Sequence, residues 1–251
     1  MAITRYTASA DNTITNAFEA NLLTRGSGSN MGFADSLEVF SIYGQDSGSN
    51  GQSSELSRIL IQFPVDAISA DRTAGIIPAA GSVSFYLKMF NAEHPFTLPQ
   101  DFNLVVAPIS QSWNEGTGLD MDNYQDLGFS NWGSASSTAG WTNIGGDYLA
   151  SDNYNVRFQQ GYEDMEVDVT TVVENWIIGE EGGKYNNYGF GIRLTASQEA
   201  YFSSSLGTTS GSVLQNINGA TESYYTKKFF ARSTEFFFKR PVLEARYDSR
   251  V

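Results

Sequence analysis

The residues whose types and spacing suit acid–base chemistry are carboxylates in the middle of the chain. Hydrolysis of a glycosidic bond uses two carboxyl groups held about 5–10 Å apart. Closeness in sequence does not fix such a separation, and no recognisable motif surrounds these side chains. We therefore expect no catalytic residues and no enzymatic activity from the candidate carboxylates, which are Glu115, Asp120, Asp122, Asp126, Glu163, Asp164, Glu166 and Asp168.

The sequence contains few side chains suited to nucleophilic catalysis. The chain has no cysteine and one histidine, His94. A Ser-His-Asp triad would have to use His94, and no serine lies in a Gly-x-Ser-x-Gly turn. His94 is therefore predicted to be an ordinary loop residue. The absence of cysteine also excludes disulfides and iron–sulfur clusters.

Any metal would be a hard cation on oxygen ligands, and Asp120-Met121-Asp122-Asn123 begins like a calcium loop. Gln125 stands where that loop needs glycine, and no glutamate follows at its twelfth position. A solvated acidic loop is the preferred interpretation. We expect no metal site and no cofactor.

Aromatic side chains in polar loops are candidates for binding. They suit two uses, stacking on the rings of a sugar or anchoring a protein interface, and the sequence does not separate these uses. Some of them are expected only to cover the core. The candidates are Trp132, Trp141, Tyr148, Tyr154, Tyr185 and Tyr188.

Charge is unevenly distributed within the total of −13. Residues 1–100 hold 9 acidic and 5 basic side chains, residues 101–200 hold 15 and 3, and residues 201–251 hold 4 and 7. The net charges of −4, −12 and +3 argue against binding of nucleic acid, which needs a basic face. They suit contacts between the basic end of one copy and the acidic middle of another, or simply a soluble acidic surface.

Membrane and export signals are not expected in this sequence. No uninterrupted apolar stretch reaches the length of a transmembrane helix. Residues 1–12 lack the charged start and the apolar run of a signal peptide. We therefore expect no membrane association, and synthesis in a cytosol.

The elements that must position these side chains are mostly strands. In Ser82–Met89 polar and apolar residues alternate, which places Val83, Phe85, Leu87 and Met89 on one face. Many short strands bounded by Gly, Pro, Asn, Asp or Ser indicate a sandwich or barrel. The other predicted strands are Leu37–Tyr43, Arg58–Phe63, Leu104–Ile109, Met165–Val169, Phe190–Leu194, Lys228–Ala231 and Val242–Tyr247.

One short helix is predicted at Thr171–Ile178. Thr171 and Glu174 have capping-box spacing, and Gly179 suits the helix end. A helix this short needs packing to be stable, so Trp176 is predicted to close one end of the core. The predicted buried residues are Val83, Phe85, Leu87, Val167, Val169 and Trp176.

Long polar loops separate the strands at residues 45–55, 130–146 and 203–221. Because they alternate with strands, we interpret residues 1–251 as one domain with long loops. Such loops are either mobile or held by a partner. Residues 1–12 are predicted to form an N-terminal arm that adds as a strand to a neighbouring subunit.

Several local motifs, in content and order, resemble the DNRLRE-type jelly-roll domain. The resemblance covers about Leu37 to Tyr247, and the signature departs at Thr234-Glu235 and the following run of three phenylalanines. The motifs are Ser112-Trp113-Asn114-Glu115-Gly116, Asn131-Trp132 with Trp141, Asp168-Val169-Thr170 with Trp176 and Gly179, Asn187-Tyr188-Gly189-Phe190, Phe230-Ala231-Arg232-Ser233, and Arg240-Pro241-Val242-Leu243-Glu244.

The resemblance implies a single antiparallel jelly-roll-like β-sandwich with one short helix. Domains of this type occur in secreted or surface proteins, some of which bind polysaccharides, and similar domains occur as virion proteins of tailed phages. We expect a non-enzymatic virion structural protein, a capsid decoration or tail-associated component, made in the host cytoplasm. Its partners would be other virion proteins and copies of itself. The alternative is a carbohydrate-binding module with a glycan as partner.

Overall fold

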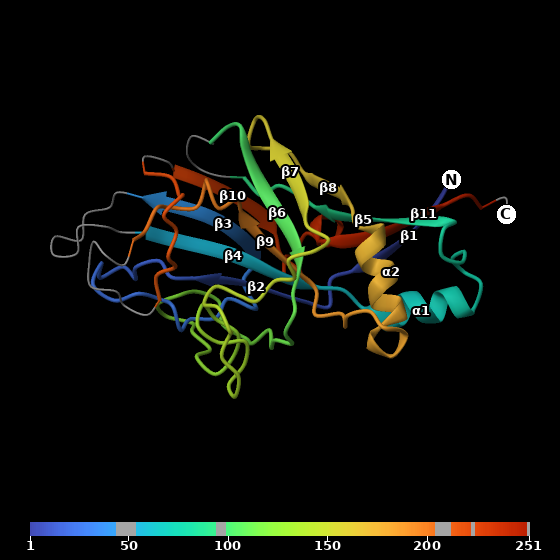
Figure 1. The fold of residues 1–251 in the computed structure, drawn as a ribbon, viewed down its shortest axis with the longest axis horizontal. Coiled ribbons are helices and arrows are strands. Elements are labelled where there is room, and N and C mark those ends of the chain that lie inside the picture. The colour runs from blue at the N-terminus through green and yellow to red at the C-terminus, as the bar shows by residue number, and fades with distance from the viewer. Residues whose placement is uncertain (44–53, 94–98, 204–211, 222–223, 250–251) are drawn as a thin grey trace.

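The computed structural model describes residues 1–43, 54–93, 99–203, 212–221 and 224–249. Within these residues the chain forms two antiparallel sheets and two short α-helices. The predicted all-β sandwich is therefore confirmed. Figure 1 shows the larger sheet on one side and the helices together at the opposite end, beside the smaller sheet.

The smaller sheet has four strands in the order β1-β11-β5-β8. The strands from the two ends of the chain lie next to each other, and two strands from its middle follow. The first strand therefore pairs with the last strand, and the last strand pairs with a central one. Their bounds are β1 (Ala2–Thr7), β11 (Val242–Tyr247), β5 (Val83–Met89) and β8 (Met165–Asp168).

The larger sheet has seven strands in the order β10-β3-β4-β9-β6-β7, and the seventh, β2, pairs with β4. The strands predicted at 37–43, 58–63, 104–109, 190–194 and 228–231 all lie here, with ends shifted by up to four residues. The bounds are β10 (Tyr224–Phe230), β3 (Ser36–Tyr43), β4 (Ser54–Gln62), β9 (Phe190–Leu194), β6 (Phe102–Pro108), β7 (Tyr154–Phe158) and β2 (Ala10–Thr15).

The main core lies between the two sheets. The inward side chains of β5 are buried as the alternation predicts, and Val169 and Trp176 are buried as well. Val167 is only half-buried, so its predicted burial is wrong. The reason is its place on β8, at the edge of the smaller sheet, where a neighbouring strand covers one side only.

The predicted helix is α2 (Thr170–Ile178), and it ends at Gly179, whose φ of +67° suits glycine. The expected capping box of Thr171 and Glu174 is wrong, because the N-cap residue is Val169 and the Asp168 carboxylate accepts the first helical N–H, that of Thr170. Glu174 instead forms two hydrogen bonds of 2.7 Å with the Arg72 guanidinium. Trp176 packs against Phe190 with ring centroids 4.6 Å apart, in agreement with its predicted role.

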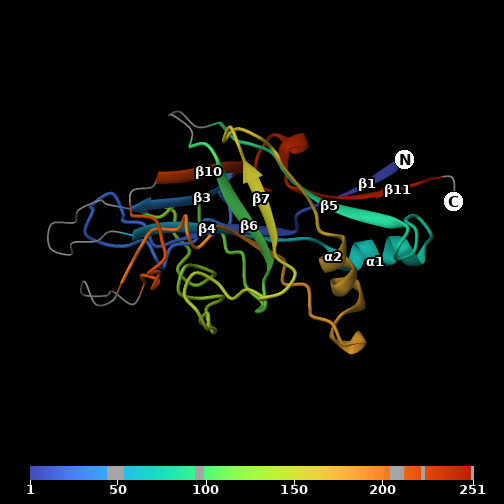
Figure 2. The same cartoon turned by 45° about the horizontal axis from the view of Figure 1, so that its top comes forward.

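A second helix, α1 (Val65–Thr73), was not predicted. Only two of its residues, Val65 and Ile68, are buried, so its sequence lacks a clear apolar stripe. Its Arg72 holds Glu174 of α2, and Figure 2 shows the two helices side by side. Tertiary contacts with α2 and the core therefore stabilise a segment that is weakly helical by itself.

The N-terminal segment 1–12 is built into its own chain and is not a free arm. Residues 2–7 form β1, and residues 10–12 begin β2. The side chains of Tyr6 and Ala8 lie in the main core. The segment therefore connects the two sheets of the sandwich, and only the outer edge of β1 is left unpaired among the described residues.

Candidate interaction surface

The two candidate tryptophans of the polar loops are buried. Trp132 has no exposed surface and Trp141 is 7% exposed. The Trp132 indole N–H donates to the Ser212 carbonyl and the Trp141 indole N–H donates to the Asn131 carbonyl, both over 2.8 Å. Neither ring has a face available to a sugar or a partner.

These rings form a second core on the outer face of the larger sheet. Leu56 and Leu60 of β4 contact this cluster, whereas Ile59 and Ile61 face the main core. β4 is thus buried on both faces, and the loop at 130–146 covers its outer side. This described loop is therefore held by its own chain, while residues 45–53 and 204–211 lie outside the described residues.

The candidate tyrosines are half-buried and bonded within the chain. The Tyr148 hydroxyl donates to the Gly145 carbonyl over 2.6 Å, and the Tyr185 hydroxyl donates to Asp152 over 3.0 Å. Burial raises the pKa of Tyr185 to about 12. Tyr154 packs against the main core, and Tyr188 against the second core.

Most of the candidate carboxylates have structural partners. Asp164 accepts the backbone N–H of Asn91, Asp168 accepts the N–H and hydroxyl of Thr170, and Asp126 accepts those of Thr117. Glu166 pairs with Arg246, and Glu163 accepts two backbone N–H groups. Asp122 lies in an exposed loop, and its side chain has no partner among the described residues. The candidate carboxylates therefore do not form one site.

Glu115 is the exception, because it lies beside the buried Asp11. Both carboxylates accept hydrogen bonds from Arg232, Glu115 from the guanidinium and Asp11 from the backbone N–H. Burial raises the pKa of Asp11 to about 7, against the lowering effect of the bond from Arg232. The second Asp11 oxygen has no hydrogen-bond partner among the described residues. Sequence reasoning missed Asp11, since it lies in a strand far from Glu115 along the chain.

The calcium-like segment has a local structural use. The Asp120 carboxylate accepts three backbone N–H groups, from Asp122, Asn123 and Tyr124, which lowers its pKa. Among the described residues, no group of three or more His, Cys, Asp or Glu side chains is placed to hold a metal. His94 lies outside the described residues.

The most exposed aromatic side chain of the described residues, Phe238, lies in the connection between β10 and β11 beside two other exposed phenylalanines. Phe236, Phe237 and Phe238 are 56%, 62% and 86% exposed. The Phe237 and Phe238 rings meet edge to face at 5.5 Å, and Phe236 packs on Phe230 at 5.6 Å. We call residues 236–238 the aromatic turn.

The aromatic turn is held in place by bonds within the connection. Arg240 donates from Nε and Nη2 to the Thr234 carbonyl over 3.2 and 3.0 Å, and Lys239 donates its N–H to the Phe236 carbonyl over 2.8 Å. The Arg240 guanidinium also lies 5.4 Å from the Phe237 ring. These contacts favour one conformation in which the phenylalanine rings face solvent.

One groove adjoins the aromatic turn at Phe236, and a second groove adjoins the first. The first has a volume of about 820 Å³, and its walls combine Phe230 and Phe236 with charged residues such as Glu93, Lys228 and Lys239. The second, of about 550 Å³, shares Asp35 and Ser36 with the first and is lined by Phe33, Leu119, Met121 and Tyr124 among others. Aromatic turn and grooves together form a surface of apolar side chains interrupted by charges, which is typical of a protein interface.

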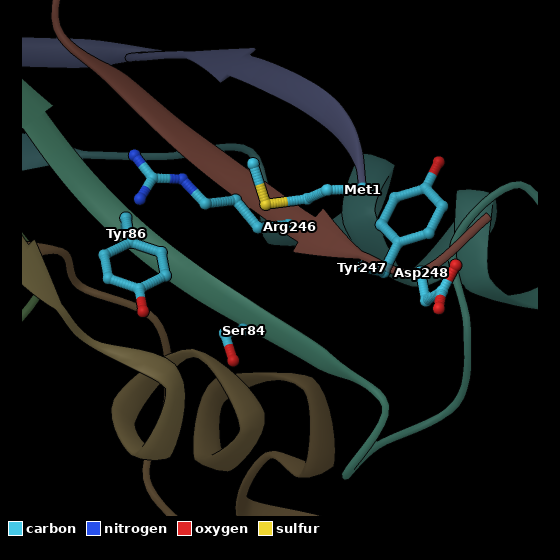
Figure 3. A pocket seen from close by; sticks show the side chains of 6 residues that line it. All are labelled: Met1, Ser84, Tyr86, Arg246, Tyr247 and Asp248. Carbon is cyan, nitrogen blue, oxygen red and sulfur yellow. The ribbon is translucent and has the colours of Figure 1, made fainter.

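A third hollow lies on the outer face of the smaller sheet (Figure 3) and has a volume of about 440 Å³. The Arg246 guanidinium lies 4.0 Å from the Tyr86 ring centroid. It also bonds Glu166 and Glu244 over 2.9 and 2.6 Å. Because its charge is balanced by these carboxylates, this hollow has weak attraction for an anion.

A fourth hollow, of about 480 Å³, lies where α1, α2 and residues 186–188 meet. Trp176 and Tyr188 line it together with the amides of Asn186 and Asn187. The Trp176 indole N–H is buried and has no hydrogen-bond partner among the described residues. The Asn186 amide donates to the Tyr188 hydroxyl, and the Asn187 amide bonds Phe63 and Gly189. Aromatic rings beside one unpartnered N–H donor suit a small polar ligand.

The basic end of the chain meets the acidic middle inside one molecule. Arg232 pairs with Glu115 over 2.7 Å, and Arg246 pairs with Glu166 over 2.9 Å. Lys228 pairs with Glu38 over 3.2 Å. These cations are already engaged, so the apolar surface is the stronger candidate for contacts with other molecules.

The aromatic turn was visible in the sequence only as a departure from a family signature. A run of three phenylalanines reads as core-forming by composition, and nothing local shows that a turn will expose it.

None of the described helices is long and apolar enough to cross a membrane. A scan against protein-family models matches no family, and a search of curated proteins gives no match.

Proposed function

We propose that the protein is a non-enzymatic virion structural protein, a capsid decoration or tail-associated component, that binds neighbouring virion proteins through the aromatic turn and its grooves. The proposed contact rests on one observation. Three consecutive phenylalanine side chains are exposed in a turn held by the hydrogen bonds of Arg240 and Lys239. The assignment to a virion rests on the resemblance in motif content and order.

The energetics favour protein contact at this surface. Aromatic side chains dominate binding energy at interfaces, and a turn fixed before binding loses little conformational entropy on association. Charged residues at the rim, such as Glu93, Glu235 and Lys239, suit orientation of the partner. Burying the exposed parts of Phe237 and Phe238 supplies the apolar area that affinity requires.

The test is incorporation of variants into particles. The Phe237→Ser/Phe238→Ser double variant removes rings that contact mainly each other and Arg240, so its fold should persist. We expect at least a tenfold loss of occupancy in purified particles. The matched control is Leu22→Ser/Leu23→Ser, which removes two exposed apolar side chains elsewhere and should leave occupancy unchanged. Full occupancy of the phenylalanine variant would refute the proposed contact.

A second candidate function, carbohydrate binding, is favoured by the hollow at Trp176. The unpartnered Trp176 indole N–H and the Asn186 amide, which has one bond to the Tyr188 hydroxyl and further hydrogen-bonding capacity, are groups that bind sugar hydroxyls. This hollow differs from the loop tryptophans first considered for sugars, which are buried. Glycan-array binding of the purified protein that is lost in Asn186→Ala, together with absence of the protein from particles, would favour this function over the virion proposal.

A further inference from the structure

Strand β1 lies at the end of the smaller sheet with one edge unpaired. It pairs along its whole length with β11, from Ala2 opposite Tyr247 to Thr7 opposite Val242. No other strand among the described residues pairs with it. Figure 3 shows β1, the strand that follows Met1, running beside β11 with no strand beyond it in that view. The edge is six residues long and contains no proline.

The register shows which backbone groups face outward. Just beyond the strand, the Ala8 N–H donates to the Pro241 carbonyl over 3.0 Å, in the same register as the β1–β11 pairs. In an antiparallel ladder the bonding residues alternate, so the even-numbered residues of β1 bond to β11. The N–H and C=O groups of Ile3, Arg5 and Thr7 therefore point away from β11. Among the described residues, these outward backbone groups form no hydrogen bond.

The other strands at sheet edges carry features that discourage pairing. β8 has four residues, and its Glu166 and Asp168 are exposed. β10 has a fully buried lysine, Lys227, and an antiparallel bridge from Asn91 to Phe229 crosses its end. β7 has an exposed ion pair between Arg157 and Asp101. Short edges, charges and covering segments are the known means of blocking association between sheets.

β1 differs because its one charge is directed back over its own sheet. Arg5 bonds Glu244 of β11 over 2.9 Å, on the side away from the free edge. Ile3, on the same face, is 43% exposed. The free edge therefore has unpaired backbone groups, an exposed isoleucine and a cation held by its own chain.

We propose that β1 pairs with β1 of a second copy, antiparallel and about a two-fold axis at Thr4, which joins the two four-stranded sheets into one. Outward-bonding residues must face outward-bonding residues, so Ile3 lies opposite the second copy's Arg5 and the reverse. This register pairs the whole of β1. It also keeps the two Arg5 side chains from lying directly opposite each other, where like charges destabilise a sheet.

A second copy fits this edge better than an unrelated strand because the pattern is self-complementary. Pairing uses the free edge of each copy, so the contact closes at two molecules when the other edges are protected. The dimer deepens the proposed function by naming one contact between copies. The dimer is tested on purified protein, and the aromatic turn is tested by incorporation into particles. Either proposal can therefore fail while the other one holds.

The first test uses the absence of cysteine. In the proposed register the two Thr4 residues form a non-hydrogen-bonded pair with Cβ atoms about 4.5–5.5 Å apart, close to disulfide geometry. Thr4→Cys should form a covalent dimer under mild oxidation at least tenfold faster than Thr138→Cys, which places the thiol in an exposed loop. Equal rates for the two variants would overturn the pairing.

The second test is sedimentation of the intact protein from micromolar to sub-millimolar concentration. We expect a monomer–dimer equilibrium that Ile3→Pro shifts to monomer, because proline removes an outward N–H and leaves the bonds to β11 in place. The control is Ile217→Pro, which places the same substitution at an exposed isoleucine in a turn outside both sheets. A wild-type monomer at all concentrations, or an unchanged dimer in Ile3→Pro, would overturn the proposal.

Discussion

The Arg58 guanidinium and the Glu199 carboxylate form a buried two-pronged ion pair, with Nε–Oε1 and Nη2–Oε2 distances of 2.9 and 2.8 Å. Arg58 lies on β4, and its third bond goes to the Gly145 carbonyl over 2.9 Å. Burial by itself lowers the pKa of Arg58, but the attraction of Glu199 raises it above the ordinary value. One side chain of the larger sheet thus holds two covering loops.

Breaking this pair should be strongly destabilising. Glu199→Ala leaves a buried guanidinium without its counter-charge, so we expect a loss of about 3–5 kcal/mol in the free energy of unfolding. Urea titration followed by tryptophan fluorescence measures it, since Trp132 lies near Arg58. The exposed pair Arg157–Asp101 is the control, and Asp101→Asn should cost less than about 1 kcal/mol. Similar small losses in both variants would contradict the role given to Arg58.

Trp176 should contribute as a buried closure of the core. It packs on Phe190, and Trp176→Ala is expected to cost about 3–5 kcal/mol. Ile178→Ala, two residues further along α2 and half exposed, should cost less than about 1 kcal/mol. Thermal unfolding of both variants makes the comparison. A near-neutral Trp176→Ala would show that the ring is not a closure.

Asp11 should make stability depend on pH. Its pKa is about 7 in the folded protein against 3.8 in the unfolded chain, so between these values the folded state binds more protons. The Asp11 contribution to the free energy of unfolding therefore falls as pH rises from about 4 to about 7. Asp11→Asn removes this dependence, so the variant should gain stability relative to wild type across that range. Parallel pH profiles for the two proteins would contradict the assignment.

Much of the fold was predictable because the main-core strands alternate. In β5 every second residue is apolar, and this period of two fixes both the strand and its buried face. The helix α1 and the strand β2 escaped prediction for a different reason. β2 reads Ala-Asp-Asn-Thr-Ile-Thr, and its Asp11, Asn12 and Thr13 are buried by polar contacts with distant loops. Such burial depends on partners that a local pattern does not contain.

The candidate surface was harder to predict than the fold. Tryptophans in polar loops suggested exposed binding rings, yet Trp132 is buried with its loop against β4, which is buried on both faces. The phenylalanines at 236–238 were noted only as a departure from a family signature, and their exposure follows from a turn held by the bonds of Arg240 to Thr234. In both cases the exposure of a ring is decided by residues far from it or by turn geometry, which hydrophobicity alone does not encode.

Deleting residues 1–12 should unfold the protein or cost more than about 4 kcal/mol, because the segment carries part of two sheets. It removes Tyr6, whose hydroxyl donates to Asp71 of α1 over 2.7 Å, and Asn12, whose amide donates to Ser130. Deleting Met1 alone, which is 85% exposed, should have little effect. Circular dichroism and urea titration of the two truncations make the measurement. If the longer truncation were as stable as wild type, β1 would contribute nothing to the fold, and the edge proposed for pairing between copies would lose its structural basis.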